Sequence, residues 1–195
     1  MKILVITLSG IGDAIMFTPA LQLLCGQYPD AEIDILTMFK GVADIFERSE
    51  KINKVYHWDF VKQETVRTLG FLRKLRRNKY DVSITVFPAN RREYNILSFL
   101  IGAKKRIGTD YLHLNSSSFP FLLTDRTRED DSFHNVEENC RIVELAGVTI
   151  PKEIPPLHID VLPEDEIPAQ TWLAKNLPQS DKQTIIGIHA GSATF

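Results

Sequence analysis

The chain has 195 residues, of which 44% are apolar, and it carries 25 acidic against 23 basic side chains. This composition is typical of a globular protein with one large domain or two small ones, and it excludes a disordered chain. No window approaches the roughly 18 to 20 uninterrupted apolar residues of a membrane-spanning helix. A net charge of −2 gives no overall attraction to nucleic acid, so we expect no nucleic-acid partner.

The chain start and the two cysteines indicate a cytoplasmic protein. The apolar run that follows Lys2 is interrupted at Ser9 and Gly10, too early for a signal sequence. Cys25 and Cys140 lie far apart and form no C-x-x-C pair. The sequence therefore predicts two reduced core cysteines, without a disulfide framework or a zinc site.

The first half of the chain alternates short apolar runs, which predict buried strands, with amphipathic stretches, which predict helices. The predicted strands are residues 2–8, 32–37, 54–58, 81–87 and 105–108. The predicted helices are residues 14–27, 42–47, 65–77 and 93–101. Such alternation predicts an α/β fold with a doubly wound parallel sheet.

Two of these helices carry further signals. Pro19 lies inside the predicted helix 14–27, where it is expected to remove a backbone donor and bend the helix. In helix 65–77 the apolar residues recur at three-residue steps, which predicts the face that packs on the sheet. These residues are Val66, Leu69, Leu72 and Leu75.

The second half is less regular. Residues 109–132 predict a long loop or irregular hairpin, and residues 135–146 predict a helix that stops at Gly147. Five prolines between residues 151 and 168 indicate a linker, although residues 157–161 also fit a strand and residues 167–176 a helix.

Residues 184–189 predict a new buried strand, followed by a small-residue turn. A parallel strand needs a crossover and neighbours, so we expect a second α/β domain to begin here; the alternative is an extra strand at the edge of the first sheet. The expected organisation is a first domain over 1–160, a linker over 161–183 and the start of a second domain over 184–195.

A glycine-containing turn, residues 9–13, follows the first predicted strand. Glycines there let the backbone approach a ligand. The dinucleotide fingerprint would require a third glycine where Ile15 stands and an acidic residue where Thr37 or Met38 stands. Both are missing, which disfavours a nicotinamide enzyme.

Asp13 is the strongest candidate for chemistry. In one interpretation its carboxylate only complements the dipole at a helix start. In the other it is a general base at the carboxyl end of the first strand, where ligands bind in open α/β sheets, and accepts a proton from a substrate hydroxyl.

The segment from Lys2 to Leu21 resembles the amino terminus of family 9 glycosyltransferases, the lipopolysaccharide heptosyltransferases. The resemblance rests on Ser9-Gly10-Ile11-Gly12-Asp13 followed by Thr18-Pro19-Ala20-Leu21. It continues through residues 28–33, 80–81, 102–108 and 134–147. Residues 188–192 resemble the first strand and phosphate-side loop of that family's second domain.

The resemblance implies the amino-terminal half of a GT-B glycosyltransferase with two Rossmann-like domains, no cofactor and no metal. It implies an inverting transfer of a sugar, with ADP-heptose as the expected donor, to an anionic glycolipid acceptor of the lipopolysaccharide-core type. Asp13 would be the catalytic base. Ser9, Gly10 and Gly12 would contact the acceptor, and Gly191 and Ser192 would lie near the donor phosphates. The chain by itself is expected to be inactive.

Basic residues suggest where an anionic acceptor or the inner face of the inner membrane is contacted. Arg91 and its neighbour Arg92 follow the strand 81–87, and we select Arg91 for an acceptor phosphate or carboxylate. The basic residues of 73–79 and 104–106 fit a lipid phosphate or, alternatively, a solvated helix face. Two other functions stay open, namely another GT-B-like nucleotide-sugar enzyme such as an epimerase, and a noncatalytic sugar- or nucleotide-binding module.

Overall fold

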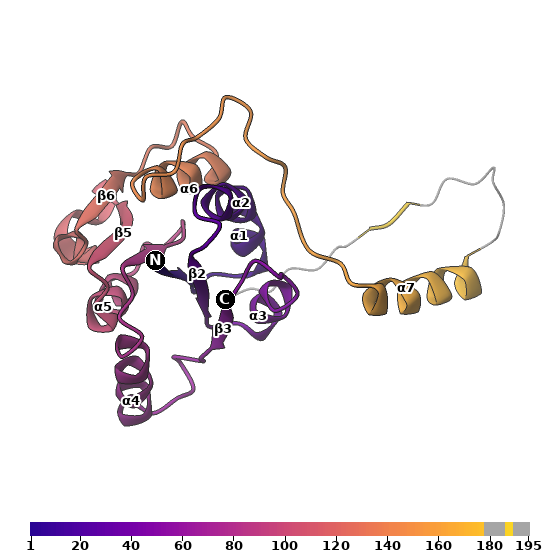
Figure 1. Ribbon diagram of the computed structural model, residues 1–195, viewed down its shortest axis with the longest axis horizontal. Coiled ribbons are helices and arrows are strands. Elements are labelled where there is room, and N and C mark those ends of the chain that lie inside the picture. Colours follow the sequence, from indigo (N-terminus) through magenta and orange to yellow (C-terminus); the bar gives the residue numbers. More distant parts are fainter. Residues whose placement is uncertain (178–185, 189–195) are drawn as a thin grey trace. The chain divides into compact units, whose positions relative to one another are not determined.

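A parallel sheet of six strands lies at the centre of residues 1–160 (Figure 1). The computed structural model describes residues 1–177 and 186–188, and it divides into two compact units, Met1–Asp160 and Val161–Phe195. The strands are β1 (Lys2–Thr7), β2 (Glu32–Thr37), β3 (Lys54–His57), β4 (Val82–Thr85), β5 (Lys105–Asp110) and β6 (Asp125–Arg128). Their order across the sheet is β3-β2-β1-β4-β5-β6.

Helices cover both faces of this sheet, which explains why β1 is apolar at nearly every position. Ile3 and Val5 of β1 pack in the cluster under one set of helices, whereas Leu4 and Ile6 point to the other face. The first set is α1 (Ile11–Met16), α2 (Thr18–Gln27), α3 (Lys40–Phe46) and α6 (Asn135–Glu144), and the second is α4 (Thr65–Arg76) and α5 (Arg92–Ile101) (Figure 1). The predicted doubly wound α/β sheet is confirmed.

The order of the strands reverses beside β1. The chain passes from β1 to β2 and β3 on one side and then returns to β4 on the other side of β1. The loops after β1 and β4 therefore leave the sheet toward opposite faces. In doubly wound sheets, ligands bind at such a switch point, at the carboxyl ends of the strands.

The sequence predicted one helix over residues 14–27, but the structure has two helices there, so this prediction is wrong. Helix α1 begins earlier, at Ile11, and ends at Met16, and α2 starts at Thr18 with Pro19 in its first turn. Proline costs no hydrogen bond in a first turn, because the amide there has no partner within the helix. Pro19 thus begins a second helix and does not bend one long helix.

The predicted loop over 109–132 contains a strand that the sequence did not reveal. Two short 3-10 helices, Leu112–Ser118 and Pro120–Leu122, are followed by β6, which pairs in parallel with β5. The β6 sequence, Asp-Arg-Thr-Arg, has no apolar residue because an edge strand is only half covered. The following helix α6 and its stop are confirmed, since Gly147 has φ +94°.

Only part of the predicted apolar face of helix α4 packs against the sheet. Leu72 and Leu75 are 3% and 0% exposed, but Val66 and Leu69 are 80% and 53% exposed. Only the second half of α4 therefore packs on the sheet, and its first two turns present aliphatic side chains to solvent. No helix in the described part of the chain is long and apolar enough to cross a bilayer.

The second unit contains α7 (Pro163–Asn176), within the residues predicted as a linker. Residues 157–161 form no strand, and residues 186–188 lie in no helix or strand. Thr184, Ile185 and His189 of the predicted last strand lie outside the described residues, so the domain boundaries stay a prediction. Both cysteines are free, with Cys140 buried and Cys25 half-buried.

Candidate functional site

Two loops meet at the switch point, at the carboxyl ends of β1 and β4. The first, residues 8–10, leads from β1 into α1, and the second, residues 86–91, leads from β4 into α5. The hydroxyl of Ser9 donates a hydrogen bond to the carbonyl oxygen of Pro88 over 2.9 Å. This bond fixes the two loops to each other although they are 79 residues apart.

The second loop is held from below by two buried side chains. The amide of Phe87 donates to Oδ1 of Asn139 over 3.0 Å, and Nδ2 of Asn139 donates to the Phe87 carbonyl and to the carbonyl of Asn135. The amide of Ala89 donates to the hydroxyl of Tyr111 over 2.6 Å. Asn139 and Tyr111 are 0% and 1% exposed. The backbone of the second loop is therefore hydrogen-bonded to two fully buried side chains.

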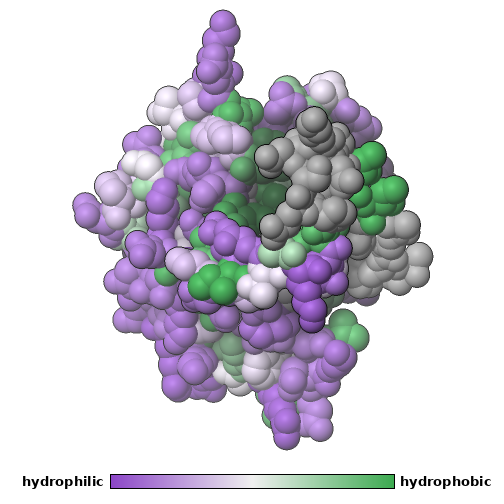
Figure 2. Space-filling model, turned by 90° about the vertical axis from the view of Figure 1, so that its right-hand side faces the viewer, coloured by the Kyte–Doolittle hydropathy of each residue, from purple (hydrophilic) through white to green (hydrophobic). Residues whose placement is uncertain are grey.

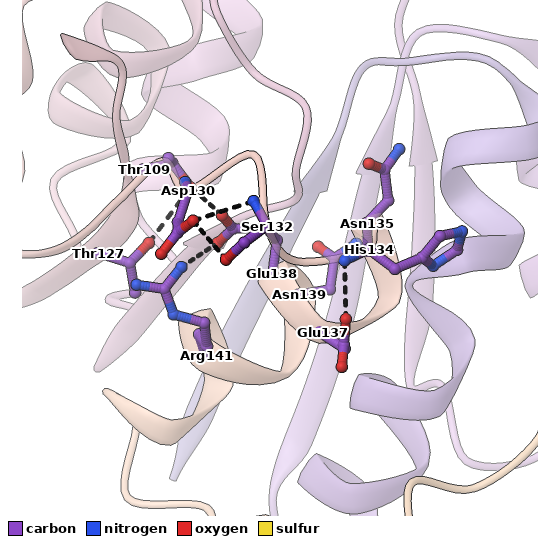
Figure 3. A network of polar contacts seen from close by, with 10 residues as sticks. All are labelled: Thr109, Thr127, Asp130, Ser132, His134, Asn135, Glu137, Glu138, Asn139 and Arg141. Atoms are coloured by element: carbon purple, nitrogen blue, oxygen red, sulfur yellow. Dashed lines mark hydrogen bonds and ion pairs between the residues drawn. The ribbon is translucent and has the colours of Figure 1, made fainter.

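A network of polar contacts holds the start of α6, from which Asn139 projects (Figure 3). Glu138 is buried, accepts a hydrogen bond from the amide of Asp130 and pairs with Arg141 over 2.9 Å. His134 caps the helix: its Nδ1 accepts from the amide of Val136, and its own amide donates to Glu137. His134 is thus a structural residue.

Asp13 lies in the first turn of α1 and is half-buried. Burial raises the pKa of its carboxyl above the ordinary value, and the backbone amide of Gly10 offsets part of this effect. A carboxylate with a raised pKa is a better proton acceptor than a solvated one. Asp13 therefore has the electrostatic setting that a general base needs.

The space around the glycine turn is open. A Cβ atom built on Gly10 or Gly12 would meet no atom of the chain within 4 Å. Neither glycine has a positive φ, since Gly102 and Gly147 are the positive-φ glycines among the described residues. Neither backbone strain nor internal packing therefore requires glycine at these two positions.

Tyr94 of α5 connects the two sides of the site. Burial raises the pKa of the Tyr94 hydroxyl, the nearby positive charge of Arg91 lowers it, and the negative charge of Asp13 raises it again. Asp13, in the first turn of α1, and Arg91, at the end of the second loop, are therefore both near enough to Tyr94 for their charges to affect its pKa. Arg91 is exposed at the start of α5, whereas Arg92 is exposed next to Glu93, 3.5 Å away.

The structure thus brings together Ser9, Gly10, Gly12, Asp13 and Arg91, all selected from the sequence. Gly191 and Ser192, predicted for the donor phosphates, lie outside the described residues. Sequence reasoning missed Tyr94, Tyr111 and Asn139. The spacing of Tyr94 from Arg91 on a helix was an available signal, whereas the supports of the second loop depend on contacts over 22 and 52 residues. Among residues 1–177 and 186–188 no group of three or more His, Cys, Asp or Glu side chains is placed to hold a metal ion.

Comparison with curated proteins relates the chain to one kind of enzyme. It is 29% identical over 110 residues to Lipopolysaccharide heptosyltransferase 3 of Escherichia coli, a match that covers 54% of this chain and 32% of that protein. It is 26% identical over 146 residues to Lipopolysaccharide heptosyltransferase 3 of Escherichia coli strain K12, covering 71% and 40%. No family model matches the chain.

Solved structures agree in fold. A glycosyl transferase family 9 protein from Veillonella parvula superposes with a TM-score of 0.76 at 25% identity, over 99% of this chain and 54% of that one. The Escherichia coli ADP-heptose lipopolysaccharide heptosyltransferase II (TM-score 0.68, 20% identity) is covered to 52% by 92% of this chain. Escherichia coli heptosyltransferase WaaC with ADP-2-deoxy-2-fluoro heptose superposes with a TM-score of 0.67 at 18% identity, over 92% of this chain and 56% of that one. The chain thus spans about half the length of these solved relatives and less of the curated ones. The predicted resemblance is confirmed: the chain is similar in sequence to lipopolysaccharide heptosyltransferases and similar in sequence and fold to a family 9 glycosyl transferase.

Proposed function

We propose that the chain forms the acceptor side of an inverting glycosyltransferase that moves heptose from ADP-heptose to an anionic glycolipid of the lipopolysaccharide-core type. The single observation that carries the proposal is the position of Asp13. Its carboxyl has a raised pKa and lies in the first turn of α1, just after β1 at the switch point, beside two glycines whose surroundings are open. Switch points of this kind bind the ligands of doubly wound sheets.

In the proposed reaction the Asp13 carboxylate accepts the proton of an acceptor hydroxyl. The oxygen of that hydroxyl forms a bond to the anomeric carbon of the sugar, while the bond from this carbon to the phosphate oxygen breaks and ADP leaves with the electron pair. Because the attack comes from the side opposite the leaving group, the configuration inverts. Burial of the carboxyl favours the protonated form that results from this step.

The other site residues take supporting roles in the proposal. Ser9 fixes the loop after β1 to the loop after β4, and Gly10 and Gly12 leave room for the acceptor. Arg91 supplies a positive charge for an acceptor phosphate or carboxylate. The relation to a heptosyltransferase bound to an ADP-heptose analogue supports the choice of donor, and Gly191 and Ser192 are assigned to the donor phosphates by resemblance.

Since the chain covers about half of its solved relatives, we further propose that residues 1–195 alone do not transfer sugar. Formation of a glycosylated acceptor by residues 1–195 would contradict this part of the proposal. We also propose that the protein is cytoplasmic and works at the inner face of the inner membrane, where its glycolipid acceptor would be held.

The test is the Asp13→Asn variant, made in the full-length protein. General-base catalysis contributes roughly 10²- to 10⁴-fold, so we expect kcat to fall by about that factor while the KM for the acceptor changes little. Asp30→Asn, a change at an exposed carboxylate in the turn before β2, is the matched control. Full transfer by Asp13→Asn would remove Asp13 as the base.

A further inference from the structure

Positive charge is concentrated in one part of this slightly acidic chain. Residues 62–107 contain 12 Lys and Arg but three Asp and Glu, a net charge of +9, whereas the whole chain carries −2. All other residues together therefore carry −11. Five of these 12 basic residues lie in α4 and α5, the helices that cover one face of the sheet, and four of the five are in α4.

Several of these basic side chains make no polar contact within the described part of the chain. Arg73, Lys74 and Arg77 are exposed on the outer side of α4, and none of them makes a side-chain hydrogen bond or ion pair within residues 1–177 and 186–188. Arg76 differs, since its guanidinium donates to the carbonyl of Leu100 over 3.1 Å and ties α4 to α5. The charges of the first three are thus available to an external partner.

Apolar side chains are interspersed among these charges. Val66 and Leu69 of α4 are 80% and 53% exposed, and on the neighbouring α5 Phe99 is 47% exposed. Hydrophobic groups also lie between hydrophilic ones on the side of the protein drawn in Figure 2, which is the right-hand side of Figure 1. We call the outer surface formed by Arg73, Lys74, Arg77, Val66, Leu69 and Phe99 the basic face.

We propose that the basic face docks the protein on the surface of an anionic lipid bilayer. Lipid phosphates attract arginine and lysine side chains, and short apolar side chains enter the boundary between headgroups and acyl chains. A nucleic acid would use the charges but not the exposed valine and leucine. The proposal rests on the proposed function and deepens it, since docking would bring the protein to the membrane that holds the lipid-linked acceptor.

The experiment is co-sedimentation of residues 1–195 with vesicles. We expect binding to vesicles of phosphatidylcholine with 30% phosphatidylglycerol and no binding to pure phosphatidylcholine. The double variant Arg73→Glu with Arg77→Glu should weaken binding about tenfold or more, because each basic residue near an anionic surface contributes to attraction. The matched control is Arg128→Glu with Lys152→Glu, which changes the net charge equally at exposed positions outside the basic face.

Two further measurements keep the proposal open to refutation. Val66→Ser with Leu69→Ser leaves every charge in place and should weaken vesicle binding several-fold. Unchanged binding would overturn the claim that apolar side chains of the basic face enter the membrane. Equal loss in the control pair, absence of binding to anionic vesicles, or tight binding to single-stranded RNA in place of vesicles would each overturn the proposal. Asp13→Asn should bind vesicles as the wild type does, and transfer to a detergent-solubilised acceptor does not depend on docking. Failure of one proposal is therefore distinguishable from failure of the other.

Discussion

Two aspartates at opposite ends of the sheet show how the same side chain takes different tasks. Asp34, near the amino end of β2, is 5% exposed and fully held: Tyr80 donates to its Oδ2 over 2.6 Å and Asn53 to its Oδ1 over 2.7 Å. Asp13, at the carboxyl end of β1, is less buried, and open space surrounds the glycines beside it.

The difference lies in what surrounds each carboxylate. The Tyr80 hydroxyl also accepts from Asn78, which donates to Tyr56 as well, so the polar atoms around Asp34 satisfy one another. Burial beside Asp34 raises the pKa of Tyr80, which keeps this phenol protonated as a donor. A satisfied network of this kind stabilises a fold and leaves no group free for a substrate. The carboxylate of Asp13, in contrast, remains free to receive a proton.

The largest effect on stability is expected from Asp34→Ala. Removing the carboxylate leaves the buried donors of Tyr80 and Asn53 without their acceptor, which costs about 3 kcal/mol of the free energy of unfolding. Urea denaturation followed by circular dichroism measures this change, and Asp131→Ala at an exposed position is the control. A loss below about 1 kcal/mol would show that the network around Asp34 does not support the fold.

A smaller effect of opposite sign is expected from Gly12→Ala. The added Cβ meets no atom within 4 Å, and alanine favours a helical position over glycine by about 0.5 to 1 kcal/mol. The variant should therefore be as stable as the wild type or slightly more stable in urea, while its affinity for the acceptor falls because the methyl group occupies open space. Lower stability combined with unchanged acceptor affinity would mean that Gly12 serves the fold.

The smallest effect is the pH dependence of stability in Asp13→Asn. Since the folded-state pKa of Asp13 is raised, ionisation of this carboxyl destabilises the folded wild type as the pH rises from the unfolded-state pKa through the folded-state pKa. The Tm of the variant, compared with that of the wild type, should thus increase between about pH 3 and pH 7. A relative decrease over the same range would show that the folded state stabilises the Asp13 carboxylate.

Much of the fold could be predicted from local pattern. Strand β1 and helix α5 have strong periodic signals, and β2 begins and ends at the predicted residues. Strand β6 could not be predicted, because an edge strand with alternating half-burial carries no apolar run. The exposure of Val66 and Leu69 could not be predicted either, because helical periodicity shows which residues share a face but not how far along the helix the sheet extends.

The candidate site divides in the same way. The amino-acid sequence by itself determined the parallel α/β class, the resemblance to family 9 glycosyltransferases, and the placement of Asp13 after the first strand, because all of these depend on residues close together in the chain. Only the tertiary structure decided that the loop after β4 meets this turn, that Tyr94 lies near both Arg91 and Asp13, and that Asn139 and Tyr111 support the loop. Strand order and long-range hydrogen bonds create these contacts, and neither is encoded in any short segment of the chain.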